Sequence, residues 1–340
     1  MGFISKLLRL FSGSTKTAST RSASVRKNAT RKEHNVALDK GWLTLTQPYF
    51  FGRAHCSPNR RWVVGCSDSD GAGRGGHRES GYGRVVLVEH QTDKIMHELT
   101  SFARPFDAAV SDTGDYIVLD AGFGSALQGD VIAISSSGHE RYRRRYSANV
   151  FNLGLSKCGR YASVQTANAP GDDGNRLEVI DLELGCTIFN VRPATGWADR
   201  YSFHVDAEGR LKAFGVEHKG LGRFNYSATG EFLDWQAFQA AQLDKGDYST
   251  KLMAARDLLK SNATADSANK ALSIADAALT EGAKDRPDWC AIAHRVRGES
   301  YELLGQLPEA VKAFEQALAL NPKIGVQKRV VALRKKLGSG

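Results

Sequence analysis

Between Trp42 and Trp235 the chain alternates short apolar runs with polar turns, a pattern typical of β-strands. Four similar turns recur in this stretch: SPNRRW at Ser57, SDTGDY at Ser111, SKCGRY at Ser156 and DAEGRL at Asp206. Their starts lie 54, 45 and 50 residues apart, and each is followed by a second hairpin-like segment. The pattern predicts four repeated units, each built of antiparallel strands joined by short turns.

After Trp235 the apolar positions change to helical spacing and stay there to the end of the chain. Residues 291–324 predict two amphipathic helices joined at Gly-Gln-Leu-Pro, and the final segment, 325–337, predicts one more helix. That last helix is expected to turn four side chains inward: Val326, Val330, Val331 and Leu333. The fold class predicted is therefore a β region at 41–236 followed by an α-helical region at 237–338.

The stretch 291–324 resembles a tetratricopeptide repeat. The residues that carry the resemblance keep one 34-residue register: Gly298, Tyr301, Gly305, Glu309, Ala310, Phe314, Ala317 and Pro322. His294 and Arg297 depart from it, because the family pattern has Trp and Leu there. The resemblance implies a helical hairpin of a kind that usually binds other proteins. Its matching residues are packing residues, so they indicate a fold and name no site.

The four β units resemble the blades of a β-propeller of the broad WD40/YVTN-like type, although the Trp-Asp dipeptide is absent. Four units are few for a closed ring. Two arrangements stay open at this point. The strand expected in 41–50 helps to close the ring, or the assembly stays open and a partner covers its edge. This resemblance also implies an interaction module.

Residues 1–40 form a separate, basic segment that is expected to be a flexible tether. Within it, residues 2–11 predict a short amphipathic helix with Ile4, Leu7, Leu8 and Phe11 on one face. Peripheral contact with an anionic membrane is one hypothesis for this helix. The alternatives are a mitochondrial transit peptide, docking into a partner's groove, folding back on the protein's own body, and disorder.

The totals narrow the class of protein. The net charge is +9, yet residues 1–40 hold nine Lys/Arg and two acids, and residues 321–340 hold six Lys/Arg and no acid. The basic character therefore belongs to the two ends. The five cysteines are scattered without a CxxC pair, which favours free thiols in a reducing compartment. No apolar run is long enough for a transmembrane helix. A cytoplasmic location follows as an expectation, with a membrane-peripheral location left open.

In a four-stranded blade the loops after the second strand lie on the face opposite the loops after the first and third. Those loops are long and polar here, at 67–84, 121–130, 166–176 and 217–222. Long loops on a rigid scaffold are where binding residues usually lie, so this face is the leading site hypothesis. The alternative is that the loops are tolerated surface insertions. The candidate partner-binding residues are Asp68, Asp70, Arg74, His77, Arg78, Phe123, Asp172, Asp173 and His218.

A second candidate site is the segment 141–146, Arg-Tyr-Arg-Arg-Arg-Tyr. On a strand, Arg141, Arg143 and Arg145 share one face, a basic stripe that suits phosphates and stacked bases. The competing interpretation is the charged outer strand of a blade, where long side chains protect an edge. Lys335 and Lys336 in the last helix would add to a nucleic-acid contact, although the favoured interpretation of this helix is a polar cap on the helical region.

The sequence gives little support to catalysis or metal binding. Asp68, Asp70 and Glu79 fit only part of a calcium-loop spacing, and the glycine-rich stretch after them lacks the GK[ST] ending of a phosphate loop. The nine histidines show no metal-ligand spacing, and no cofactor is expected. The leading hypothesis is a non-enzymatic scaffold that binds proteins. The alternatives are a nucleic-acid-associated protein and an enzyme with a site on the loop-bearing face.

Overall fold

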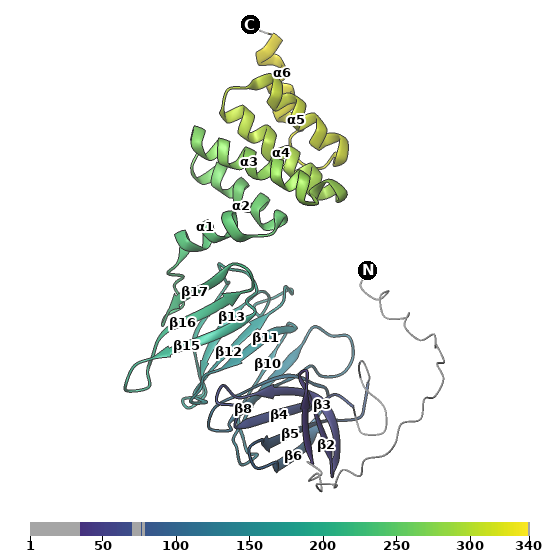
Figure 1. Cartoon of the computed structure of the whole chain (residues 1–340), viewed down its shortest axis with the longest axis vertical. Helices are drawn as coiled ribbons and strands as arrows, with labels where there is room; N and C mark the ends of the chain where they lie inside the picture. Colours follow the sequence, from purple (N-terminus) through teal and green to yellow (C-terminus); the bar gives the residue numbers. More distant parts are fainter. Residues whose placement is uncertain (1–34, 70–75, 77–78, 339–340) are drawn as a thin grey trace, which may run out of the picture. The chain divides into compact units, whose positions relative to one another are not determined.

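The computed structural model describes residues 35–69, 76 and 79–338 (Figure 1). In the described residues, seventeen strands come first, and six α-helices with one short 3-10 turn follow, so the prediction of β units followed by helices is confirmed. The first strand begins at Val36, five residues before the expected start of the β region at 41. Residues 35–340 form one compact unit by their contacts. The division between 236 and 237 therefore stays a prediction.

The strands form four antiparallel sheets. Within each sheet, every strand pairs with the strands that precede and follow it in the chain. Sheet 1 contains β1 (Val36–Asp39), β2 (Trp42–Thr46), β3 (Tyr49–Cys56), β4 (Trp62–Ser67), β5 (Gly83–Glu89) and β6 (Lys94–Phe102). Sheet 2 contains β7 (Pro105–Val110), β8 (Tyr116–Asp120), β9 (Gly129–Ile134) and β10 (Glu140–Tyr146). Sheet 3 contains β11 (Val150–Leu155), β12 (Tyr161–Thr166), β13 (Leu177–Asp181) and β14 (Cys186–Val191). Sheet 4 contains β15 (Arg200–Val205), β16 (Leu211–His218) and β17 (Gly222–Ser227).

The four repeated turns have the same backbone conformation. The fourth residue of each takes a positive φ: Arg60 at 58°, Gly114 at 90°, Gly159 at 76° and Gly209 at 76°. Glycine reaches this conformation without strain, which explains its presence in three of the four turns. The first residue of each turn accepts or donates hydrogen bonds within the turn, as when Trp62 N donates to Ser57 Oγ at 3.0 Å.

Hydrogen bonds also join each turn to the turn of the next sheet. Asn59 N donates to Asp112 Oδ1 at 2.7 Å, and Trp62 Nε1 donates to Asp112 O at 3.2 Å. Asp112 N donates to Lys157 O at 2.9 Å, and Tyr161 Oη donates to the carbonyl of Gly209 at 2.8 Å. These bonds place all four turns on one face of the β region, which we call the turn face.

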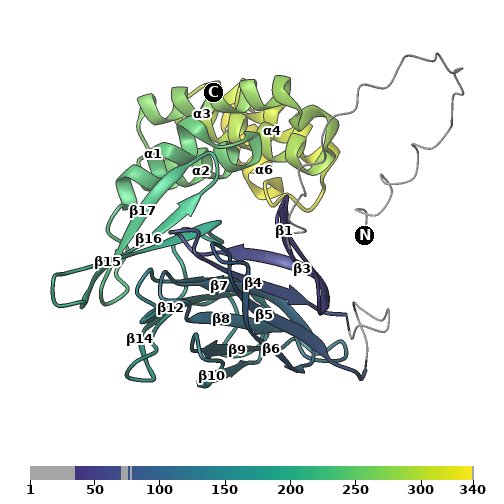
Figure 2. The same cartoon turned by 60° about the horizontal axis from the view of Figure 1, so that its bottom comes forward.

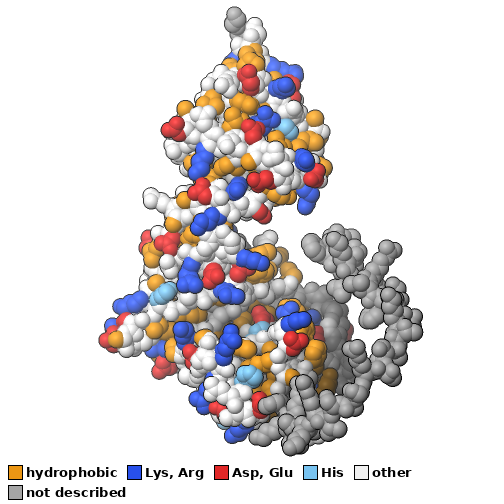
Figure 3. Space-filling model, viewed as in Figure 1, with side chains coloured by type: hydrophobic (Ala, Val, Ile, Leu, Met, Phe, Trp, Pro, Cys, Tyr) orange, Lys and Arg blue, Asp and Glu red, His pale blue; other side chains and the backbone are white. Residues whose placement is uncertain are grey.

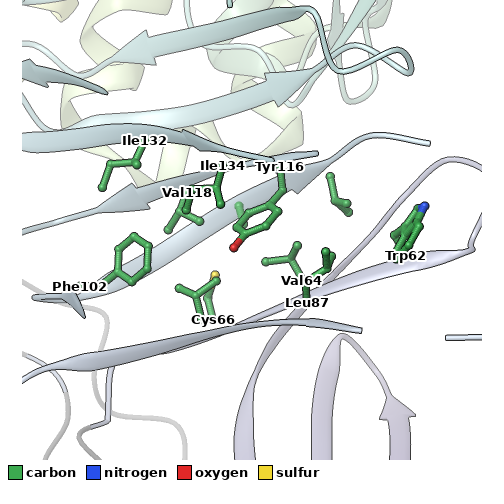
Figure 4. Packing of buried hydrophobic residues seen from close by; sticks show 12 residues of the cluster. Trp62, Val64, Cys66, Leu87, Phe102, Tyr116, Val118, Ile132 and Ile134 are labelled. Atoms are coloured by element: carbon green, nitrogen blue, oxygen red, sulfur yellow. The ribbon is translucent and has the colours of Figure 1, made fainter. Parts of the chain in front are cut away.

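Consecutive sheets pack through apolar clusters. Trp62, Val64 and Leu87 of sheet 1 meet Tyr116 and Ile132 of sheet 2 (Figure 4). A second cluster joins sheets 2 and 3, and a third joins sheets 3 and 4. The second strand of each unit is buried along most of its length because it lies inside these layers. At roughly 25 cal/mol per Å² of apolar area removed from water, these layers supply the main stabilisation of the β region.

Sheets 1 and 4, the first and last in the series, differ in what covers the face turned away from the neighbouring sheet. In sheet 1, Leu43 and Phe50 pack on the face of Val63 and Val86, so the β1–β2 hairpin covers its own sheet. Gly65 permits this fold-back, since a Cβ there would lie 2.7 Å from Leu43 Cδ2. The stretch 41–50, one of whose predicted roles was ring closure, thus forms β2 and the start of β3 and extends sheet 1.

Strands β16 and β17 of sheet 4 instead alternate between an apolar and a polar face. Phe214, Val216, Phe224 and Tyr226 belong to the cluster shared with sheet 3. The intervening residues are mostly polar, among them Glu217, Arg223, Asn225 and Ser227. Sheet 4 therefore presents no second apolar layer on which a further blade would pack.

The helices are α1 (Trp235–Lys245), α2 (Tyr248–Ser261), α3 (Ala265–Glu281), α4 (Pro287–Leu303), α5 (Leu307–Leu320) and α6 (Gln327–Gly338), with the 3-10 turn η1 (Ala283–Asp285). Phe238 of α1 packs edge-on against Phe224 of β17, with 5.0 Å between ring centroids, and so anchors the first helix to sheet 4. Figure 2 shows α1 beside β17. Within the described residues, no helix has both the length and the apolar character needed to cross a membrane.

The α4–α5 hairpin packs as its small residues predict. Ala310, Phe314 and Ala317 are fully buried, and a Cβ at Gly298 would lie 2.5 Å from the Phe314 ring. The last helix differs from its prediction at one position. Val330 and Leu333 are buried, but the Val331 side chain is 61% exposed. At about 100° per residue, Val331 is turned away from the face that Val330 buries.

Candidate binding surface on the β region

The long loops after the second strands lie at the end of the sheets opposite the turn face, and we call this end the loop face. Its first loop is described only in part. Asp68 accepts a hydrogen bond from Gly76 N at 2.6 Å. The other candidates of this loop, Asp70, Arg74, His77 and Arg78, lie outside the described residues, as does the amphipathic segment 2–11.

Two β-bulges at the loop face turn phenylalanines outward. The register of β7 against β8 shifts between Pro105 and Asp107, and that of β11 against β12 shifts between Val150 and Asn152. The extra residues are Phe106 and Phe151, with exposed fractions of 50% and 49%. A bulge redirects a side chain at the edge of a sheet. The same device in two consecutive units places two equivalent aromatic rings on the inner edge strands.

Further aromatic side chains extend this line. Phe151 stacks on Trp197 with 4.7 Å between ring centroids, and Trp42 stacks on Phe51 at 5.0 Å. The guanidinium of Arg53, two residues after Phe51 on β3, lies 5.5 Å from the centroid of Phe106 and links the Trp42–Phe51 pair to sheet 2. All five rings are between 43% and 50% exposed. We call Trp42, Phe51, Phe106, Phe151 and Trp197 the aromatic row.

A groove of about 380 Å³ opens beside Phe106, between sheets 2 and 3. The loop after β8 forms one wall with Ser125 and Gln128, while Asn149 and Val150 form the other. Arg104 also lines this groove, and its Nε atom is buried. Within the described part of the chain that Nε has no hydrogen-bond partner. A smaller hollow of about 250 Å³ adjoins it through Gln128 and is lined in part by Phe123.

The remaining loop candidates have different surroundings. Phe123 lies in the hollow just described, and its carbonyl accepts a hydrogen bond from Gln128 Nε2 at 3.3 Å. Asp172 is exposed, whereas Asp173 is half-buried and accepts from Ser147 N and Ser147 Oγ. Burial raises the pKa of Asp173, but these hydrogen bonds outweigh it and the net pKa is lowered. Asp173 thus ties a loop to the end of sheet 2.

His218 does not belong to the accessible surface. It ends β16, is only 7% exposed and packs against the rings of Phe224 and Phe238. Burial lowers its pKa below the ordinary value, so the neutral imidazole is favoured. The proposal of His218 as a partner-binding residue was wrong because the apolar surface of α1 covers this strand end.

The basic stripe is neutralised by acidic partners. Arg141 pairs with Asp115 at 2.8 Å, Arg143 with Glu140 at 2.6 Å and Arg145 with Asp130 at 2.6 Å. The hydrogen bond from Arg145 lowers the pKa of Asp130, which keeps that carboxylate charged. The three stripe arginines lie on β10, which is an edge strand of sheet 2, as expected if their side chains protect that edge. Lys335 and Lys336 are exposed on α6.

Buried polar groups elsewhere hold sheets together. Glu178 is 1% exposed and accepts from Tyr146 Oη at 2.8 Å and from Thr187 Oγ1 at 2.5 Å, and it pairs with Arg144. This network joins β10 to sheet 3. Among the described residues, no group of three or more His, Cys, Asp or Glu side chains is arranged to hold a metal ion.

Sequence reasoning missed the aromatic row, although a signal for it exists. The runs FDAAV and FNLGL, at Phe106 and Phe151, both place Phe before Asp or Asn at the start of an inner strand. Asp107 and Asn152 each accept a hydrogen bond from the next backbone N–H, which fixes the strand just after its bulge. The repeated Phe-Asx pair was thus visible, but its outward direction was not.

Comparisons with known proteins agree with the predicted hairpin. A family model described as tetratricopeptide repeat matches residues 291–324, which span most of α4, all of α5 and the residues that follow it up to 324. No curated protein matches the chain. Solved structures that are similar include the β-propeller domain of Cps50 (Swd1) from Myceliophteria thermophila, at 13% identity and TM-score 0.31, covering 59% of this chain and 67% of that one. TolB from Acinetobacter baumannii is similar at 12% identity and TM-score 0.32, covering 56% of this chain and 46% of TolB.

Proposed function

We propose that this protein is a non-enzymatic interaction scaffold whose principal binding surface is the aromatic row at the loop face of the β region. The observation that carries the proposal is the repeated bulge that exposes Phe106 and Phe151. Solvent-exposed aromatic rings are the side chains that most often supply binding energy at protein interfaces. Two pairs are already stacked, so little side-chain entropy is lost when a partner covers them.

The rest of the surface supports a protein partner over a nucleic acid. Phosphate binding needs cationic groups that are free to replace counterions. The three stripe arginines already have carboxylate partners. A nucleic acid would have to break those pairs before it gained their charge. The tetratricopeptide hairpin supports the same class of function, since its family binds proteins.

The helices offer a second surface for the same function. A groove of about 660 Å³ runs along α1, α2 and α3, with Trp235, Leu258 and Lys260 among its lining residues. Trp235 is 50% exposed. A scaffold that joins two partners would use the aromatic row for one and this groove for the other. We place the main contact on the row because there the repeat itself produces the exposed rings.

Quantitative affinity purification of the tagged full chain from its native cells tests this proposal. The row variant carries Phe106→Ser and Phe151→Ser. Leu184→Ser is the matched control, because Leu184 is a 70% exposed apolar residue in the turn between β13 and β14, away from the loop face. Trp235→Ser tests the helical groove.

We expect the row variant to lose at least one partner by about fivefold or more while Leu184→Ser retains it. Partners lost only with Trp235→Ser would assign binding to the helices and overturn the place of the row. An unchanged set of partners in the row variant would do the same. Melting curves of the purified variants show whether the fold is intact, because both phenylalanines are half-exposed and their loss is expected to leave stability within about 1 kcal/mol.

A further inference from the structure

The groove beside Phe106 contains an arginine without an anion. Arg104 lines the groove, and its Nε is buried without a hydrogen-bond partner in the described part of the chain. Its backbone is fully used, since Arg104 N donates to Asp120 Oδ1 at 2.7 Å and its carbonyl accepts from Ala121 N. A guanidinium stays charged at any physiological pH and cannot accept a hydrogen bond. A buried donor of this kind is normally paired, so its place at a groove indicates a ligand acceptor.

A second arginine, from sheet 1, contacts the Phe106 ring that lines this groove. Arg53 extends from β3 over the Phe106 ring, 5.5 Å from its centroid, and within the described residues it makes no ion pair. The contact resembles the cation–π pairs that stabilise an arginine while leaving its N–H groups free for an anion. Arg53 and Arg104 thus both lie near the exposed Phe106 ring, and neither makes an ion pair within the described residues.

The acids nearest to this groove make other contacts, and none of them forms an ion pair with Arg53 or Arg104 in the described structure. Asp120 accepts from the backbone N–H groups of Ala103, Arg104 and Gly122. Asp107 lies 3.4 Å from His55 Nδ1. Glu79 approaches Gly124 at the rim and has an interaction of its own. The contrast with the stripe is direct, because each stripe arginine has a carboxylate within 3.3 Å.

We propose that this groove binds an acidic peptide segment of the partner protein, with an Asp or Glu carboxylate on Arg104 and Arg53 and an adjacent apolar side chain on Phe106. The inference rests on the proposed function and deepens it. A guanidinium fork matches a carboxylate bidentately, and the half-exposed ring offers an apolar contact beside it. The protein's own N-terminal segment is a poor occupant, since its nine Lys/Arg against two acids would meet two arginines.

The probe is a random dodecapeptide library displayed on phage and selected on the immobilised full chain. We expect enriched sequences to place Asp or Glu next to an aromatic or aliphatic residue. A synthetic peptide of the enriched sequence should bind Arg104→Gln at least 10-fold more weakly than wild type, about 1.4 kcal/mol. Arg143→Gln is the matched control and should change the Kd less than twofold, because Arg143 is an ion-paired surface arginine.

Several outcomes would overturn the inference. These are enrichment of basic or uncharged peptides, no enrichment at all, or equal binding by wild type and Arg104→Gln. Displacement of the peptide by inorganic phosphate at millimolar concentration would show that the groove takes free anions and would also count against a peptide site. Arg53→Gln keeps the question answerable if Arg104→Gln is unstable.

Failure of the inference is distinguishable from failure of the proposed function. If Phe106→Ser with Phe151→Ser removes partner binding and Arg104→Gln does not, the aromatic row stands and its acidic ligand does not. If neither variant changes partner binding, both the proposed function and the acidic-peptide inference are contradicted. Light scattering tests for self-association through the groove. A molecular mass that rises with protein concentration in wild type but not in Arg104→Gln would show that a second copy of this chain occupies the groove, and it would overturn the proposal of a partner peptide.

Discussion

The turn face and the loop face belong to the same four sheets yet use their residues in opposite ways. On the turn face, Asn59, Trp62 and Asp112 bond across sheets, and Tyr161 reaches the carbonyl of Gly209. On the loop face, aromatic rings stand half-exposed and Arg104 lacks an acceptor in the described structure. The space-filling view in Figure 3 shows one face of the molecule, where hydrophobic side chains reach the surface among scattered charged side chains.

The difference teaches how a repeat separates stability from binding. A short turn has one low-energy conformation, so it can be repeated and cross-linked to its neighbours. A long loop is free to vary, and a bulge at the next strand aims a side chain outward. Substitutions on the turn face should therefore change folding, and substitutions on the loop face should change binding.

The largest expected effect is on stability, from Trp62→Ala on the turn face. Trp62 is 7% exposed, packs in the cluster between sheets 1 and 2 and donates to Asp112 O. Its loss should lower the free energy of unfolding by about 3–5 kcal/mol in urea titrations. Trp197→Ala is the control, because Trp197 is 48% exposed and should cost less than about 1 kcal/mol. Equal losses from the two variants would end the distinction between the faces.

A smaller loss is expected from Asp112→Ala. The Asp112 carboxylate accepts from Asn59 N of the preceding turn, and its removal leaves that N–H without this partner. We expect a loss of about 1–2 kcal/mol, measured by the same titration. Asp172→Ala removes an exposed acid of the loop face and should be within about 0.5 kcal/mol of wild type. If Asp112→Ala were as stable as wild type, this hydrogen bond between turns would contribute nothing to the free energy of unfolding.

The smallest effect is a pH dependence from His97, which shares a hydrogen-bond contact of 2.9 Å with Tyr116 Oη between sheets 1 and 2. Burial lowers the pKa of His97 below its ordinary value. The unfolded chain therefore binds a proton at higher pH than the folded one. The stabilisation is complete above an unfolded pKa of about 6.5 and is lost as the pH falls through that value toward the folded pKa.

Unfolding titrations at pH 7.5 and 5.5 measure this term. His97→Gln should lose less stability than wild type over that range, although His55, His218 and His294 have lowered pKa values too and will keep part of the dependence. His204→Gln, at an exposed position in β15, should leave the difference unchanged. A steeper loss in His97→Gln would contradict the sign.

Much of the fold could be predicted from particular residues. Gly298, Ala310 and Ala317 predicted the close approach of α4 and α5, because only small residues permit it. The four turns predicted the sheets because positive φ at Gly114, Gly159 and Gly209 leaves a sequence signal. The fold-back of the β1–β2 hairpin left no such signal, since its apolar residues suit any buried strand.

The site was harder to predict because it depends on what each side chain meets in space. Arg141, Arg143 and Arg145 looked like an anion site until their carboxylate partners were known. Arg53 and Arg104 gave no sequence signal, because each is a single basic residue. They became candidates for anion binding only because the described structure pairs neither of them with a carboxylate. His218 looked like a loop residue, and only the packing of Phe238 from a later helix buries it.

Site-specific photo-crosslinking in native cells tests most directly whether the loop face binds while the turn face only supports the fold. A photoreactive phenylalanine analogue replaces Phe151 in one full-length variant and Leu184 in another, both exposed in the structure. We expect a discrete crosslinked protein at position 151 and none at 184. Crosslinking to the same partner at 184 but not at 151 would contradict the account.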